Sequence, residues 1–273
     1  MKRTRPKRVD VAGVGFDPIT QQQLIDSIAE YLRSRHKQSL VVVKPYVEFF
    51  TRAWADEKIR KLLTRADYVV ADGVAVQWAA SYLLGKQGFV PWLRSLLIDI
   101  QSRQWREQVI PERGAGVDAT HKLLLRAIAE GWSVGIFGGP KDSERTQEVL
   151  KTLYPGLRLV GVWSGFYAPA QEPSIVEIIK KEHPDILFVA QGFPRQEIFI
   201  DSYRAAGLAR VMIGEGGTFD FDSMGGNLKR APRWMRKVGL EWLWRLIQQP
   251  SRWRRQLALP RFTWRIYKIG QQK

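Results

Sequence analysis

The sequence contains no cysteine, and this absence excludes disulfides, thiolate metal sites and a cysteine nucleophile. It fits a reducing compartment. No apolar run reaches the roughly 18–20 residues that a membrane-spanning helix requires. The start of the chain, MKRTRPKRVD, is basic but has no hydrophobic region after it, so we expect no signal peptide there. With 273 residues, 45% of them hydrophobic, the chain can still bury the core of one large domain or two small ones.

Acidic residues are scarce at the two ends of the chain, which carry the net charge of +16. Residues 1–8 include five basic residues and no acid. Residues 229–273 include thirteen Lys/Arg, five of the eleven Trp and a single acid, Glu241, while the rest of the chain is nearly neutral. Basic residues interleaved with Trp suit an anionic membrane surface, and single-stranded nucleic acid uses the same two ingredients. Composition alone does not separate these partners.

Short apolar runs alternate with amphipathic segments along most of the chain, without internal repeats. The runs predict strands at 9–16, 40–43, 68–71, 132–139, 157–163, 185–192 and 209–217. The amphipathic segments predict helices at 20–35, 56–64, 74–84, 92–105, 117–130, 143–153, 174–182 and 195–206. This alternation predicts an α/β, Rossmann-like fold with a mostly parallel sheet and helices on both faces. We expect this domain over residues 9–228, followed by a basic, Trp-rich helical appendage over 229–273, and a chain ending at Leu228 should stay folded.

Asp72 occupies a position where α/β proteins bind ligands. It follows the apolar run Tyr68–Ala71, and Val74–Leu84 can continue as a helix. Ligands of open α/β sheets bind beyond the carboxyl ends of the strands, where this carboxylate falls. The alternative is that Asp72 only caps the helix, and the local sequence favours the cap because catalytic carboxylates are rarer.

Three glycine-bearing turns follow predicted strands and could hold phosphate. They contain Gly138–Gly139, the stretch GFPRQE from Gly192 to Glu197, and GEGG from Gly214 to Gly217. None matches the dinucleotide fingerprint or the P-loop, and each alone is typical of an ordinary turn. Three turns at one edge of one sheet favour anion binding more strongly. The DFD stretch at 220–222 resembles a metal-binding D-x-D but has no evident third ligand, so we interpret it as chance.

Together these stretches resemble the WecG/TagA/CpsF family of glycosyltransferases over nearly the whole chain. ADYVVADGVAVQWAASYLLG resembles the strand–Asp-Gly–helix signature of that family, QGFPRQE resembles its G-x-P-x-Q-E motif, and GEGGTFDF followed by KRAPRWMRKVGLEWLWRL resembles its most diagnostic segment. Members attach an N-acetylmannosamine-type sugar from a UDP donor to a lipid-diphosphate-linked sugar.

The resemblance implies roles for individual residues. Asp72 would be the general base, which takes the proton of the acceptor hydroxyl. Gln196 would help to hold the donor, and Arg245, Arg252 and Arg255 would fold over the site and meet diphosphate. A solvated helix face is an equally weighted alternative for these arginines. The remaining substrate-binding candidates come from the matched motifs and their surroundings: Lys44, Tyr46, Gly138, Gly139, Gly192, Pro194, Glu197, Gly216 and Asp220.

The sequence also departs from the family pattern. Lys44 and Tyr46 stand where the family carries Thr-x-Asn near the catalytic carboxylate. The resemblance therefore does not determine which sugar or acceptor fits. Lys44 close to Asp72 would lower the pKa of the carboxylate and weaken it as a base, although it could also hold a phosphate. An insertion at about 86–112 makes that segment longer than its family counterpart by roughly twenty residues, a length typical of a lid or an interaction element.

We therefore expect an inverting, metal-independent glycosyltransferase that needs no cofactor. Its donor would be a UDP-N-acetylhexosamine, N-acetylmannosamine or its uronate, and its acceptor a polyprenyl-diphosphate-linked GlcNAc in cell-wall or surface-polysaccharide biosynthesis, such as that of teichoic acid. We expect it in the cytoplasm, peripheral on the inner face of the cell membrane, with no nucleic-acid partner; a homo-oligomer is left open. There are three alternative functions. The first is a nucleic-acid-binding protein that uses the basic tail, and the second is a family member that has lost catalysis. The third, a Rossmann-type oxidoreductase, is disfavoured because GVGFDP lacks the dinucleotide fingerprint.

Overall fold

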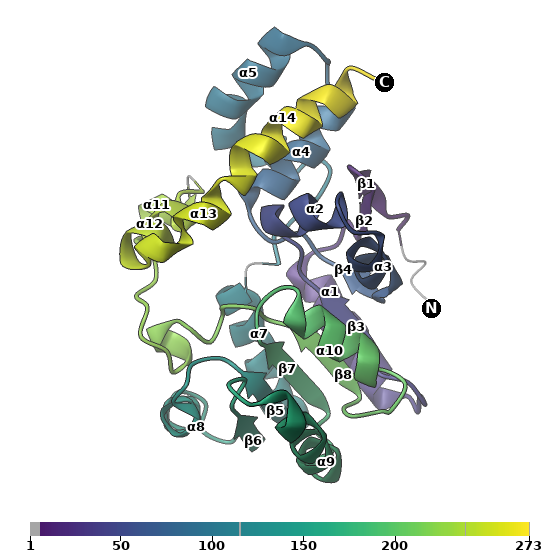
Figure 1. Cartoon of the computed structure of the whole chain (residues 1–273), viewed down its shortest axis with the longest axis vertical. Helices are drawn as coiled ribbons and strands as arrows, with labels where there is room; N and C mark the ends of the chain where they lie inside the picture. Colours follow the sequence, from purple (N-terminus) through teal and green to yellow (C-terminus); the bar gives the residue numbers. More distant parts are fainter. Residues whose placement is uncertain (1–5, 115, 238, 273) are drawn as a thin grey trace. The chain divides into compact units, whose positions relative to one another are not determined.

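A computed structural model describes residues 6–114, 116–237 and 239–272 (Figure 1). Its main sheet has the strand order β4-β3-β8-β7-β5-β6 and is flanked by helices. The strands are β3 (Leu40–Val43), β4 (Tyr68–Val69), β5 (Ser133–Gly138), β6 (Arg158–Trp163), β7 (Ile186–Ala190) and β8 (Val211–Gly214). The pairs β3–β8, β8–β7, β7–β5 and β5–β6 are all parallel. The predicted α/β, Rossmann-like fold is confirmed.

The chain forms two compact units, each built from separate segments. The first unit contains residues 1–21, 44–114 and 230–273, and the second unit contains residues 22–43 and 115–229. The division into an α/β domain over 9–228 and an appendage over 229–273 stays a prediction.

The second unit contains the strands β3, β5, β6, β7 and β8. Every residue of β5, β7 and β8 is buried, which explains their nearly continuous apolar sequences. The helices of this unit are α1 (Gln21–Arg33, whose first residue belongs to the first unit), α7 (Gly116–Glu130), α8 (Ser143–Leu153), α9 (Glu172–Glu182) and α10 (Arg195–Tyr203). All five were predicted, with ends that differ by up to three residues.

The first unit begins with a hairpin where the sequence predicted one strand over 9–16. The strands β1 (Val9–Val11) and β2 (Val14–Phe16) pair antiparallel, so that prediction is wrong. Ala12 and Gly13 have φ of +54° and +88°, the left-handed values that a two-residue hairpin turn requires. Glycine at the second of these positions adopts a positive φ without steric cost, so the chain can reverse direction within an otherwise strand-like run.

The helices α2 (Val47–Ala53), α3 (Glu57–Arg65) and α4 (Val74–Leu84) follow in the first unit. The sequence predicted α3 and α4 but not α2. Asp56 caps α3, since its Oδ1 accepts a hydrogen bond of 2.8 Å from the N–H of Lys58. In α4 only Ala75 and Leu84 are not buried, so this helix forms the centre of the unit.

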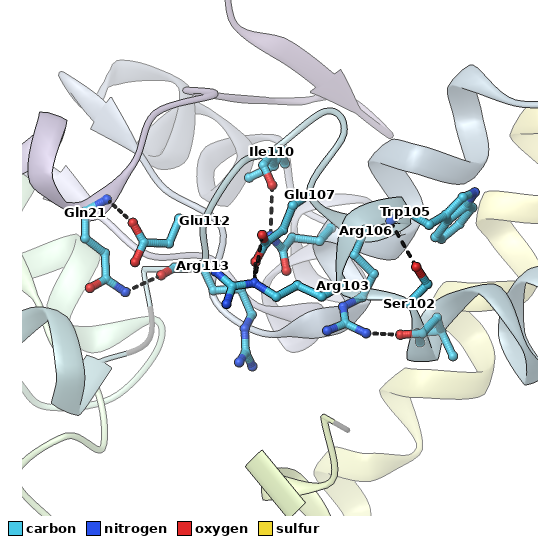
Figure 2. Close-up of polar contacts among 11 residues, drawn as sticks. Gln21, Ser102, Arg103, Trp105, Arg106, Glu107, Ile110, Glu112 and Arg113 are labelled. Carbon is cyan, nitrogen blue, oxygen red and sulfur yellow. Dashed lines mark hydrogen bonds and ion pairs between the residues drawn. The ribbon is translucent and has the colours of Figure 1, made fainter. Parts of the chain in front are cut away.

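The stretch at about 86–112, which was predicted to be an insertion, forms three short helices, so the single helix predicted over 92–105 is wrong. They are α5 (Phe89–Leu97), the 3₁₀ turn η1 (Asp99–Gln101) and α6 (Arg103–Arg106). Ser102 separates the last two, and its Oγ accepts a hydrogen bond of 3.3 Å from the N–H of Trp105 (Figure 2). A serine at this position starts a new helix by satisfying one of its free N–H groups.

The C-terminal region is helical, as predicted. It contains α11 (Arg233–Lys237), α12 (Glu241–Gln248), η4 (Pro250–Arg252), α13 (Trp253–Gln256) and α14 (Ala258–Gly270). Phe262 on α14 is fully buried, with its ring centroid 4.8 Å from that of Phe50 and 5.9 Å from that of Trp54. The helix α14 is therefore part of the core of the first unit. This packing argues against the expectation that a chain ending at Leu228 stays folded, which stays a prediction.

Candidate active site

The predicted site residues divide between the two units, and each group is described by itself. The first unit contains Lys44, Tyr46, Asp72, Arg245, Arg252 and Arg255. The second unit contains Gly138, Gly139, Gly192, Pro194, Gln196, Glu197, Gly216 and Asp220.

Asp72 lies just beyond β4, in the turn that leads into α4. Its N–H donates a hydrogen bond of 3.0 Å to the carbonyl of Pro45, and the carbonyl of the preceding residue, Ala71, accepts one of 2.8 Å from the N–H of Gly114. The N-cap residue of α4 is Gly73, so Asp72 stands one position before the cap. Asp72 is partly exposed. A carboxylate that is fixed by its backbone and open to solvent can accept a proton from a bound hydroxyl.

Lys44 and Tyr46 flank Pro45, the residue that binds the backbone of Asp72. The predicted proximity of the segments around residues 44 and 72 is therefore confirmed at the backbone. Lys44 is buried, with 7% of its surface exposed. The hydroxyl of Tyr46 donates a hydrogen bond of 2.7 Å to Oε2 of Glu48. Burial and then the negative charge of Glu48 raise the pKa of Tyr46 above its usual range, so this phenol stays protonated.

Two of the tail arginines act on the same cluster. Nε of Arg255 lies 3.8 Å from Oε2 of Glu48, the oxygen that also accepts the hydrogen bond of Tyr46. The positive charges of Arg255 and Arg252 oppose the upward shift in the pKa of Tyr46. The guanidinium group of Arg255 thus lies at the first turn of α2, which directly follows the loop that binds the backbone of Asp72. Arg245 lies on α12 and is partly exposed.

A second part of the tail approaches the start of α4. Gly239 packs against Val74 so closely that a Cβ at residue 239 would lie 2.8 Å from Cγ2 of Val74. Val74 is two residues beyond Asp72. The tail therefore contacts the surroundings of Asp72 at two places, through Gly239 and through Arg255. A wholly solvated face does not describe Arg255, whose side chain is about half exposed and ion-paired.

The glycine-bearing turns of the second unit lie at one edge of the sheet, as predicted. They follow β5, β7 and β8, which are neighbouring parallel strands, so their carboxyl ends meet at that edge. The N–H of Gly139 donates a hydrogen bond of 2.8 Å to the carbonyl of Ala190 at the end of β7. Gly138 has a φ of +111°, and a Cβ there would lie 2.4 Å from the same carbonyl oxygen. Only glycine fits at this crossing of two turns.

Gln196 joins two of these turns through its side chain. Its Oε1 accepts hydrogen bonds of 3.1 Å from the N–H of Gly192 and 2.9 Å from the N–H of Gly216. Its Nε2 donates one of 2.8 Å to Oε1 of Glu197. Gln196 is buried, so the structure gives its amide the task of fixing the turns after β7 and β8. A direct contact with a donor stays a prediction.

Glu197 is a buried carboxyl group beside these turns, with 2% of its surface exposed. Burial raises its pKa to about 7, and the hydrogen bond from Gln196 opposes this rise. Its Oε2 has no hydrogen-bond partner in the described part of the chain. The peptide bond between Phe193 and Pro194, in the turn just before α10, is cis.

Sequence reasoning missed three polar residues, namely Glu48 in the first unit and Glu215 and Thr218 in the second. Glu48 joins Tyr46 to Arg255, and it lies in the first turn of α2, the helix that was not predicted. Its spacing of two residues from Tyr46 was the available signal. In the second unit, Oγ1 of Thr218 donates a hydrogen bond of 2.7 Å to Oε2 of Glu215, and both side chains are buried. Asp220, two residues further on, is partly exposed, and its carbonyl accepts a hydrogen bond of 2.9 Å from the N–H of Leu228.

Comparison with known proteins identifies the family. The model of the glycosyl transferase WecG/TagA/CpsF family matches residues 9–91 and 94–273. A curated relative from Bacillus spizizenii (strain W23) is 31% identical over 261 residues, which cover 92% of this chain and 90% of the relative. A second, from Bacillus subtilis (strain 168), is 29% identical over 230 residues, 84% of this chain and 87% of the relative. Both are named N-acetylglucosaminyldiphosphoundecaprenol N-acetyl-beta-D-mannosaminyltransferase. The match over almost the whole length makes this chain a member of the WecG/TagA/CpsF family of glycosyltransferases.

Proposed function

We propose that this protein transfers an N-acetylmannosamine-type sugar from a UDP donor to a polyprenyl-diphosphate-linked GlcNAc in cell-wall or surface-polysaccharide assembly. Family membership and the names of the two relatives support the reaction class and the acceptor. The observation that carries the proposal in this chain is the position of Asp72. The backbone N–H of Asp72 is hydrogen-bonded to the carbonyl of Pro45. Tyr46, the next residue, is hydrogen-bonded to Glu48, which also pairs with Arg255 of the tail.

In this proposal Asp72 accepts the proton of the acceptor hydroxyl. The hydroxyl oxygen forms a bond to the anomeric carbon of the donor sugar, and the bond between that carbon and the UDP oxygen breaks on the opposite face. UDP leaves with the electron pair, and the configuration of the sugar inverts. Arg252 and Arg255, next to the Asp72 loop, would bind the acceptor diphosphate, because guanidinium groups match its geometry and charge.

The second unit would bind the UDP phosphates. Its glycine turns follow three adjacent strands, and α10 starts at one of these turns with its positive dipole end. Gln196 would act by holding the turns in place. Since the dipole of α10 and the arginines supply positive charge, we propose transfer without a metal ion.

We also propose that the protein works at the cytoplasmic surface of the membrane, as a peripheral protein. In the ranges that the structure covers, every helix is too short or too polar to cross a bilayer. The net charge of +12 over residues 229–273 suits anionic lipids instead.

The test is sugar transfer from a panel of UDP-sugars to a lipid-diphosphate-GlcNAc analogue, followed as UDP release and product mass. We expect turnover with UDP-N-acetylmannosamine or its uronate. Asp72→Asn should lower turnover roughly a hundredfold or more without changing the circular dichroism spectrum, which is the usual scale for loss of a general base. Asp67→Asn, a partly exposed aspartate just before β4, is the control.

Three results would contradict the proposal. Near-normal turnover of Asp72→Asn would remove Asp72 from the role of base. No turnover with any donor, although UDP binds, would identify a family member that has lost catalysis, with Lys44 as the first residue to replace. RNA binding as tight as binding to anionic vesicles at the same salt would favour the nucleic-acid rival.

A further inference from the structure

We propose that α5, within the insertion at about 86–112, docks the protein on an anionic lipid bilayer by placing its outer apolar side chains among the lipids. These side chains, the α5 face, are Phe89, Val90, Leu93 and Leu97. The inference rests on the proposed membrane association. It adds an apolar docking surface to the basic tail, which was proposed to attract anionic lipids.

The α5 face is unusually exposed for its composition. Val90 is 74% exposed, Leu97 60%, Phe89 53% and Leu93 40%. Their spacing of one, three and four residues places them on one side of the helix. Leu84 and Ile98, which flank α5 in the sequence, are also 68% and 63% exposed. Exposed apolar side chains that gather on one side of a helix mark an interaction site.

The inner side of α5 is firmly attached, so the outward direction of its apolar side chains is fixed by the fold. Oγ of Ser95 accepts a hydrogen bond of 2.9 Å from Nε1 of Trp78 on α4. Nε1 of Trp92 donates one of 3.1 Å to the carbonyl of Thr263 on α14. Figure 1 shows α5 beside α14 in the first unit.

The rest of the insertion is also held by the first unit. Gln77 on α4 donates a hydrogen bond of 2.8 Å to the carbonyl of Ile110. The N–H of Gln21 donates one of 2.8 Å to Glu112, and its side chain donates one of 2.7 Å to the carbonyl of Arg113 (Figure 2). An insertion anchored at both ends presents α5 as a rigid element, unlike a loose lid.

Aromatic and basic residues adjoin the α5 face in the arrangement of a membrane interface. The ring centroid of Trp92 lies 6.1 Å from that of Trp264 and 5.5 Å from that of Tyr267. Nζ of Lys268 lies 5.4 Å from the ring centroid of Trp264, which is about half exposed. Indole rings and lysine side chains favour the headgroup level of a bilayer, with apolar side chains below them.

The charge around the α5 face selects the occupant. Residues 84–98 and 257–272 contain five basic residues and no acid: Lys86, Arg94, Arg261, Arg265 and Lys268. Asp99, the next residue of the insertion, is paired with Arg94 at 3.4 Å. A second copy of the chain on this face would set this excess of positive charge against an equal excess. Lipid phosphates would neutralise them, and acyl chains would cover the apolar side chains.

The test compares two triple variants of the full chain for binding to phosphatidylglycerol-containing vesicles by sedimentation. Val90→Ser, Leu93→Ser and Leu97→Ser together should lower the partition coefficient at least tenfold. The control combines Leu125→Ser, Leu153→Ser and Ile178→Ser, three similarly exposed apolar positions on α7, α8 and α9, and should bind like the unaltered chain. Circular dichroism and the unfolding midpoint should be alike in all three proteins, because every replaced side chain is solvent-exposed.

A second measurement does not depend on losing binding. The chain has no cysteine, so Leu93→Cys labelled with an environment-sensitive fluorophore reports on this position alone. We expect a blue shift with anionic vesicles, and none for the same label at Leu153→Cys. Unchanged vesicle binding of the α5 triple variant, or no shift at residue 93, would overturn the inference. So would a dimer of the unaltered chain that the α5 variant converts to monomer without loss of vesicle binding.

The failure of this inference can be told from failure of the proposed reaction. Transfer to a water-soluble, short-chain acceptor should be the same for the α5 variant and the unaltered chain. If neither transfers sugar but their vesicle binding differs, the proposed reaction fails and the docking surface stands. If transfer is normal and the α5 variant still binds vesicles fully, only the docking surface is refuted.

Discussion

Glu48 binds two partners with one carboxylate, and this explains how a distant part of the chain comes to lie beside the Asp72 loop. Its Oε2 accepts the hydrogen bond of Tyr46 and lies 3.8 Å from Nε of Arg255. Arg254, the neighbour of Arg255, turns elsewhere, with its guanidinium 5.6 Å from the ring centroid of Trp253. Adjacent arginines thus have different surroundings, which provides a matched pair for experiment.

We predict that Arg255→Ala raises the KM for the lipid-diphosphate acceptor by roughly 10- to 100-fold, the cost of one or two charge-assisted hydrogen bonds. Arg254→Ala should leave KM within about twofold, since loss of one exposed charge has little effect. Initial-rate kinetics with a soluble acceptor would measure both. Equal effects of the two substitutions would mean that the tail contributes only general positive charge.

Glu197 makes stability depend on pH in the direction opposite to an ordinary carboxylate. Burial raises its pKa from 4.5 to about 7, so the folded protein holds the proton more tightly than the unfolded chain. The stability linked to this proton is complete below pH 4.5 and is lost as the pH rises through 7. Glutamine, which is neutral throughout, does not lose it.

We therefore predict that Glu197→Gln gains stability relative to the unaltered chain between pH 5 and pH 8, by roughly 2–3 kcal/mol. Urea unfolding at both pH values would measure the difference. Glu182→Gln, at an exposed position on α9, is the control for the substitution itself. A difference that does not change with pH would show that residue 197 is charged in the folded protein at pH 5 as well.

At the scale of single elements, α14 completes the aromatic core of the first unit. Phe262 and Ile266 are fully buried on one side of this helix, while Arg261 and Arg265 are exposed. The guanidinium of Arg265 lies 4.8 Å from the ring centroid of Trp54, whose ring stacks on Phe262. The last helix of the chain is thus fixed both from its buried side and from its edge.

We predict that Phe262→Ala destabilises the protein by about 3–5 kcal/mol, the usual cost of removing a buried aromatic ring. Arg261→Ala, one residue earlier and exposed, should cost less than about 0.5 kcal/mol. Chemical unfolding followed by Trp fluorescence would compare them. A small effect of Phe262→Ala would mean that α14 is an optional attachment, as the sequence alone suggested.

The sequence predicted elements well where one signal was dominant. The buried strand Leu40–Val43 and the helices Val74–Leu84 and Ser143–Leu153 have the predicted bounds. It failed where a turn or a tertiary contact decided the structure. Ala12 adopts a positive φ, which alanine rarely does, so its sequence gives no signal for the turn. The helix α2 forms in a stretch, VEFFTRA, whose β-branched and aromatic residues also suit a strand.

The candidate site was predictable in part for the same reason. Asp72 and the three glycine turns follow strong strand signals, so their place at strand ends could be inferred from residue patterns. The pairing of Glu48 with Arg255 joins residues 207 positions apart, and no local pattern encodes such a contact. The amide of Gln196 was expected to face a ligand, whereas the backbone groups of Gly192 and Gly216 engage its oxygen.

At the scale of the whole molecule, the uneven charge and the α5 face predict two separable contributions to membrane binding. The attraction between basic residues and anionic lipids weakens with salt, as the Debye length falls from about 10 Å at 0.1 M to about 3 Å at 1 M. Burial of the α5 face does not depend on this screening. The two contributions should therefore respond differently to one titration.

We predict that vesicle binding of the unaltered chain falls with salt to a plateau, whereas the Val90→Ser, Leu93→Ser, Leu97→Ser variant falls to zero. Sedimentation between 0.05 and 1 M NaCl would record both curves, in the range over which surface charge is progressively screened. Identical curves would leave charge as the whole of the attraction. Residual binding to single-stranded RNA at the highest salt would contradict the preference for lipid.

The discontinuous first unit also bears on how the protein is made. Its segments are residues 1–21, 44–114 and 230–273, so ribosomes synthesise Phe50, Trp54 and Trp78 long before Phe262, the side chain that closes over them. During synthesis this aromatic cluster therefore stays incomplete until α14 has left the ribosome. The helix α14 also supports α5 through Thr263 and brings Lys268 and Trp264 beside it. The docking surface is therefore complete only after α14 has been synthesised and has packed against the rest of the first unit.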